Sequence, residues 1–273
     1  MKRDPAFILS VCFGAAGFAL RLLQNRTGFE PDTGLPVSGN VPAMLLPVLL
    51  LVSAAALYFS ACRTLPRMTE TSFAAQFRLD SRGGLSAVLA GGCIMAASGV
   101  MDLMEAAGKT APALSADGME IVTTSAGTGS SGVVIGVLSA VAGVCLAAGA
   151  ILCRRKNTQP LILLTVPVCL LARLILVYRL RSADPVLADY YLEILGLMFL
   201  ILASYRLAGF TVQAGRPRLF SFYAGSTAVL ALAMLPDGPT PAVVLALGGA
   251  LALTGFQTML IPGPETGHAA AEN

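Results

Sequence analysis

Long apolar runs separated by short polar segments occupy most of this chain of 273 residues. Each run has about 20 residues, the length that an α-helix needs to cross a hydrocarbon core of roughly 30 Å. The pattern predicts an all-α, polytopic transmembrane helix bundle. About eight spans are expected, near residues 6–23, 41–62, 85–104, 133–153, 160–179, 186–209, 219–235 and 241–261. The seventh run is short, which leaves seven spans as the alternative.

The polar segments predict where several elements begin and end. We expect residues 1–262 to form one transmembrane domain and residues 263–273 to form a disordered tail. Thr240-Pro241 and Asp184-Pro185 are typical helix starts, because an N-cap oxygen is followed by proline in the first turn. A short interfacial helix is expected in the middle of the basic segment 63–84.

Small residues in the fourth run predict close helix packing. Gly132 and Gly136, then Ser139, Gly143 and Ala147, recur at four-residue spacing. Such a ridge lets two helix backbones approach closely, and we prefer this interpretation to any ligand role for these residues.

Composition supports a membrane protein, and charge gives it an orientation. Only 12% of the residues are charged, against roughly 25% in soluble domains. The net charge of +3 is too small to indicate nucleic-acid binding. With both termini inside, twelve basic residues fall in cytoplasmic segments and four in external ones, which satisfies the positive-inside rule. We therefore expect a multi-pass protein of the cell membrane with a cytoplasmic N-terminus.

The residues that several kinds of cofactor, metal and catalytic site require are absent from the apolar runs. The only histidine is His268, in the polar tail, and no lysine lies within an apolar run. All six cysteines lie in or at the ends of apolar runs, without a CxxC pair, and are interpreted as packing residues. We therefore expect no cofactor and no metal site. The DxxDG, GxGD and nucleophile-elbow signatures are absent as well, so catalysis is the least favoured hypothesis.

Two ionisable side chains lie inside apolar runs, where a charge costs about 2.5 to 3.5 kcal/mol on insertion scales. Arg173 is in the fifth run and Glu193 in the sixth. Counting 1.5 Å per residue from the predicted helix ends places both about 10 Å below the outer membrane boundary. The two side chains are therefore expected at one level, either as a structural ion pair or as parts of a ligand site.

Other polar residues fall in the same leaflet and predict a wider cluster. Arg21 and Asp102 come from distant runs, and Asp189 lies one helical turn above Glu193. The candidate ligand-binding or ion-pair residues are Arg21, Asp102, Arg173, Asp189 and Glu193, with Arg179, Tyr178 and Tyr190 near the mouth. The alternative for the shallower residues is simple contact with water or the membrane interface.

The chain resembles a group of bacterial multi-pass membrane proteins over most of its length. The resemblance is clearest in two segments, GFEPDTGLP and LILVYRLRSADPVLADYYLEIL. No activity is attached to that group. The resemblance therefore implies a membrane helix bundle and transfers neither a function nor site residues.

Two functional hypotheses follow. The first is a transporter or solute-binding membrane component, in which buried arginine holds a small anionic or zwitterionic ligand. The second is a non-catalytic sensor or assembly subunit whose buried charges are structural. In that case a partner protein or anionic lipid would contact the basic inner segment, through Arg63, Arg67, Arg78 and Arg82.

Overall fold

The structure is a computed structural model that describes residues 5–28, 39–65, 73–77, 81–109, 126–154, 160–181 and 187–261. Eight helices in these ranges are long and apolar enough to cross a membrane, which confirms the predicted helix bundle. They are α1 (Pro5–Thr27), α2 (Val41–Thr64), α4 (Arg82–Lys109), α5 (Ala126–Arg154), α6 (Pro160–Arg181), α7 (Leu187–Gly209), α8 (Pro217–Ala233) and α9 (Pro241–Met259). Shorter elements are α3 (Phe73–Gln76), η1 (Phe210–Val212) and η2 (Leu235–Asp237).

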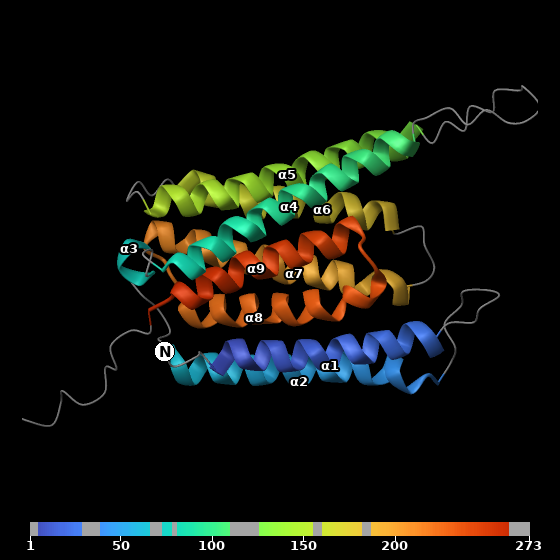
Figure 1. The fold of residues 1–273 in the computed structure, drawn as a ribbon, viewed down its shortest axis with the longest axis horizontal. Coiled ribbons are helices and arrows are strands. Elements are labelled where there is room, and N and C mark those ends of the chain that lie inside the picture. The colour runs from blue at the N-terminus through green and yellow to red at the C-terminus, as the bar shows by residue number, and fades with distance from the viewer. Residues whose placement is uncertain are drawn as a thin grey trace, which may run out of the picture.

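Successive long helices run in opposite directions, so the bundle has two distinct ends (Figure 1). The start of α1, the short helix α3 and the last turn of α9 lie together at what we call the α3 end. The end of α1, the start of α7 and the turn between α8 and α9 lie at the far end. The predicted short seventh span is present as α8, continued by η2.

Helix α4 packs between α5 and α9 through glycine contacts. A Cβ added at Gly91 would lie 2.5 Å from the backbone of Gly248 and Ala252 in α9. On the α5 side, a Cβ at Gly99 would lie 2.5 Å from the carbonyl oxygen of Gly136. No side chain larger than hydrogen fits at such separations, so the ridge predicted in the fourth run does bring two helix backbones together.

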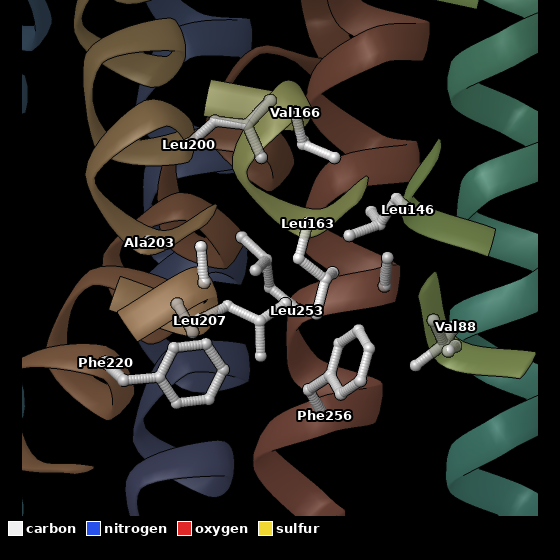
Figure 2. Close-up of a cluster of buried hydrophobic side chains, with 14 of the residues drawn as sticks. Val88, Leu146, Leu163, Val166, Leu200, Ala203, Leu207, Phe220, Leu253 and Phe256 are labelled. Carbon is white, nitrogen blue, oxygen red and sulfur yellow. The ribbon is translucent and has the colours of Figure 1, made fainter. Parts of the chain in front are cut away.

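The apolar core lies where six helices meet, from α4 to α9 (Figure 2). Its side chains include Val88 of α4, Leu146 of α5, Leu163 of α6, Leu200 of α7 and Leu253 of α9, all buried. Helices α8 and α9 have 67% of their spanning residues buried inside the protein, against 17% for α2. Helix α2 is therefore the most exposed to lipid.

An aromatic cluster fastens α3 to the α3 end of the bundle. Phe77 makes ring contacts with Phe73, Phe210, Phe220 and Phe256, with centroid distances of 4.5 to 6.3 Å. The backbone N–H of Ile261 donates to the carbonyl of Gln76 at 2.9 Å. The expected short helix is thus present, and its phenylalanines are buried under the bundle instead of lying in the membrane interface.

The carboxylates of the described ranges lie in one half of the bundle, whereas arginines occur in both halves. Every carboxylate in the described ranges belongs to the half of the bundle toward the far end: Asp102, Glu105, Asp189, Glu193 and Asp237. The α3 end carries the arginines Arg63, Arg82, Arg154, Arg206, Arg216 and Arg218. The predicted orientation would place this basic end in the cytoplasm.

Helix boundaries agree with the predicted spans to within three residues except in α1, α4 and α5. Helix α1 ends at Thr27 instead of near residue 23. Thr240 caps α9 by accepting a hydrogen bond from the N–H of Val243, as predicted. Helix α4 continues past the predicted span end to Lys109, and α5 begins at Ala126 instead of near residue 133. The Asp184-Pro185 helix start and the tail at 263–273 lie outside the described residues.

Candidate functional site

Arg173 is a buried charge that two other helices hold. Its side chain on α6 is 3% exposed. The Nη1 group donates hydrogen bonds to Asp102 Oδ2 on α4 and to Ser139 Oγ on α5. A buried guanidinium needs a carboxylate and further hydrogen bonds to be tolerated in the membrane, and this arrangement supplies both.

The carboxylate that meets Arg173 is Asp102, where the sequence had suggested Glu193. The reason is the length of α4. Because α4 runs to Lys109, Asp102 lies about 10 Å below the helix end, close to the level of Arg173 in α6. The span predicted from hydropathy ends near residue 104, which would place Asp102 too near the interface.

A cavity of about 360 Å³ opens beside this ion pair toward the far end. Its polar lining comprises Asp102 and Glu105 of α4, Arg173 of α6, Glu193 of α7, and Thr240 at the start of α9. Small-molecule sites commonly have volumes of roughly 300 to 1,000 Å³. Arg173, Glu193 and Asp102 therefore line one cavity.

The cavity contains more negative than positive charge. Three carboxylates and one guanidinium line it. Asp102 pairs with Arg173, and Glu105 and Glu193 are two further carboxylates of the lining. Glu105 is exposed at the rim, and Glu193 is half-buried farther in. A purely anionic ligand would meet this excess of carboxylates, whereas a ligand with a positive group would be attracted by it.

Arg173 keeps donors for a ligand. In the part of the chain that the structure describes, its Nε and Nη2 have no protein acceptor. The side chain as a whole is 3% exposed and lines the cavity. One edge of the guanidinium thus binds the protein and another remains for an oxygen acceptor.

Arg21 belongs to a second, separate cluster. Its Nε donates to Asp237 Oδ1 at 2.7 Å, and Asn25 Nδ2 donates to the same oxygen at 2.9 Å. Asp237 lies in η2, the turn between α8 and α9. Because α1 packs along α8 and not against α4 or α6, Arg21 does not reach Arg173. The single polar cluster expected from the sequence is therefore two clusters.

The remaining candidate residues have different positions. Tyr178 and Arg179 are exposed near the end of α6, and Tyr190 is buried on α7. Asp189 lies in the first turn of α7, but its side chain is outside the described residues. Tyr178, Arg179 and Tyr190 are not among the described residues that line the cavity.

The two ion pairs occupy related positions in the two halves of the chain. If α1, α2, α4 and α5 form the first half, and α6 to α9 the second, Arg21 and Arg173 both lie on a first helix. Asp102 lies toward the end of the third helix, α4, and Asp237 just beyond the end of the corresponding helix, α8. Each arginine pairs with the aspartate of the other half. The packing between the halves does not repeat, because α1 packs along α8 whereas no comparable packing joins α6 to α4.

Sequence reasoning missed five polar residues of these clusters. Ser139 was interpreted as part of the packing ridge, and Thr240 only as a helix cap. Glu105, Asn25 and Asp237 fall just outside the predicted spans, in the polar segments between the apolar runs. A polar residue near a helix end was the one available signal, and it does not distinguish a site from ordinary contact with water.

No metal site is evident in the described ranges. These ranges contain no group of three histidine, cysteine, aspartate or glutamate residues that could hold a metal ion. All six cysteines are free thiols.

Comparison with known proteins gives this chain no family. It matches no protein-family model, no curated protein and no solved structure. The charges and the cavity are therefore the grounds for a functional conclusion.

Proposed function

We propose that this integral membrane protein binds, and transports, a small zwitterionic solute in the cavity beside Arg173. The observation that supports the proposal is a buried arginine that lines a cavity together with three carboxylates. An acidic group of the solute would accept hydrogen bonds from Nε and Nη2 of Arg173. Its ammonium group would lie against Glu193 or Glu105.

A zwitterion fits the cavity better than an anion. Arg173 already has one carboxylate, Asp102, and two further carboxylates share the lining. An anion would neutralise the arginine edge but would be repelled by Glu193 and Glu105, whereas a zwitterion interacts favourably with both charge types. We therefore narrow the expected ligand from anionic or zwitterionic to zwitterionic.

Transport is favoured because the cavity opens on one end while apolar layers close the other. Toward the α3 end, a void of only about 10 Å³ lies beneath Arg173 and Glu193. Between this void and the α3 end lie the buried leucines labelled in Figure 2 and the phenylalanines that surround Phe77. Such an arrangement is typical of one state of alternating access, with the cavity facing outside in the predicted orientation.

The second candidate is a structural subunit without a solute. It is favoured by the two bonds of Arg173 Nη1, which already satisfy much of its charge. The two candidate functions predict different results for a variant in which residue 173 keeps a positive charge beside Asp102 but no longer presents a second guanidinium edge to a ligand. Lysine makes that change, because its three N–H donors share one nitrogen and cannot form the planar, two-edged guanidinium arrangement.

The test is a thermal-shift screen of the purified protein with small zwitterionic amino acids, organic anions and alkyl amines. We expect stabilisation by at least one zwitterion, lost in Arg173→Lys and in Glu193→Gln. Arg21→Lys is the matched control, because it alters the buried arginine of the other ion pair, and it should keep the shift. A shift with anions alone, or no shift with any solute, would contradict the proposal.

A further inference from the structure

A second cavity, mainly apolar, lies on a different face of α7 from Glu193. Its volume is about 330 Å³. Helix α8 forms its floor, while α2 and α7 form its walls. The wall residues include Pro47, Leu50 and Ala54 of α2 and Leu195 and Phe199 of α7, and the floor includes Ser226. We call this cavity the α2–α7 groove.

The groove runs along the helices and is open to lipid. Its α7 wall consists of Tyr191, Leu195 and Phe199, which lie one helical turn apart on one face and together extend for about 12 Å. On the other wall, Leu51 is 73% exposed. A ligand of this groove would therefore be elongated and would enter sideways from the bilayer.

Ser226 supplies an unused polar group at the floor. It is 5% exposed, and its Oγ has no hydrogen-bond partner in the described part of the chain. The other buried serines behave differently: Ser10, Ser53, Ser98, Ser139 and Ser204 donate to a carbonyl one turn back, and Ser221 accepts from Gln257. A buried hydroxyl without a partner is unfavourable, so an oxygen acceptor of a ligand would stabilise this site.

The depth of Ser226 restricts the chemistry of that ligand. Ser226 lies about 14 Å from the start of α8 at Pro217, near the middle of a hydrocarbon core of roughly 30 Å. The acyl chain of an ordinary phospholipid has no polar atom at this depth, because its ester groups remain at the interface. A neutral molecule with an oxygen inside a long apolar body would provide one.

We propose that the α2–α7 groove is a binding site for a neutral, elongated lipophilic molecule whose carbonyl or ether oxygen accepts a hydrogen bond from Ser226. This site is separate from the zwitterion cavity, since no residue lines both. It also stands on different observations, so either proposal can fail without the other.

Photolabelling in lipid nanodiscs tests the site. The probe is a linear long-chain ketone with its carbonyl in mid-chain and a photoactivatable diazirine at one end, and the comparison probe is the matching alkane without the carbonyl. We expect saturable labelling of α2 and α7 peptides by the ketone. Ala54→Phe, which fills the groove, should abolish it. Ala55→Phe is the matched control, because Ala55 is exposed on the same helix and outside the groove.

The hydrogen bond is tested by Ser226→Ala, which keeps the size of the groove. It should weaken ketone labelling about five- to tenfold and leave alkane labelling unchanged, since one hydrogen bond is removed. Ser204→Ala, at a serine that bonds its own helix, should change neither. Equal labelling of Ala54→Phe and Ala55→Phe would show that no defined site exists. Unchanged ketone labelling in Ser226→Ala, or alkane labelling as strong as ketone labelling, would refute the oxygen-bearing ligand.

Discussion

Double-mutant cycles at Arg173 distinguish the ion pair of the structure from the one suggested by the sequence. The first cycle combines Arg173→Met with Asp102→Leu, and the second combines Arg173→Met with Glu193→Leu. Each substitution replaces a charged side chain by an apolar one of similar size. Ser139 remains satisfied in both cycles, because its hydroxyl donates to the carbonyl of Ile135 at 2.9 Å.

The size of the effect follows from burial. Arg173 is 3% exposed and Asp102 is 12% exposed. Removing Asp102 leaves a guanidinium charge in the membrane with one hydroxyl partner, which should cost about 3 kcal/mol, at the lower end for a broken buried pair. The double variant removes both charges and should recover most of the loss. We expect a coupling energy of roughly 2 to 3 kcal/mol for Arg173–Asp102 and less than about 1 kcal/mol for Arg173–Glu193.

The assay is reversible unfolding of the purified protein in mixed detergent micelles, with free energies from the denaturant midpoints. Retained helicity of each variant before unfolding is the control. A coupling energy for Arg173–Glu193 that equals or exceeds the one for Arg173–Asp102 would show that the wrong carboxylate has been assigned to the arginine.

Three further predictions concern the bundle itself. Gly99→Leu should destabilise the protein by about 1 to 3 kcal/mol, because its Cβ would lie 2.5 Å from the Gly136 carbonyl oxygen. The control is Gly108→Ala, which has open space around its Cβ and should be neutral or slightly stabilising. Equal effects of the two substitutions would disprove the close packing. Phe77→Ala should cost about 3 to 5 kcal/mol in the same unfolding assay, and a loss below 1 kcal/mol would mean that α3 is not anchored by its rings. In intact cells, a membrane-impermeant maleimide should label Gly108→Cys but label Arg82→Cys only after permeabilisation; the reverse result would invert the predicted orientation.

The eight helices could be predicted because hydropathy and the fixed rise of a helix are local properties. The same rise placed Arg173 and Glu193 at one level, and both do line one cavity. The start of α9 was also predictable, because Thr240 and Pro241 act on their own backbone. Such features depend on neighbouring residues only.

The ion pairs could not be predicted, because they depend on which helices pack together. Arg21 and Asp237 are 216 residues apart in sequence, and nothing local to either one indicates that α1 packs along α8. Asp102 was misplaced for a related reason. The end of α4 carries Glu105 and Lys109, which lower local hydropathy although the helix continues. Ser139 shows a third difficulty, since a small residue in a packing ridge also serves as a hydrogen-bond acceptor.

The central claim is that the cavity recognises both charges of one small solute, and removing those charges one at a time tests it most directly. The measurement is calorimetric titration of the purified protein with the zwitterion that gives the largest thermal shift, and with two analogues, an amine without the acidic group and an acid without the amine. Both analogues should bind at least about tenfold more weakly, since each loses one charge-assisted contact. An acid analogue that binds as tightly as the zwitterion would contradict the account, because Glu193 and Glu105 would then have no part in recognition.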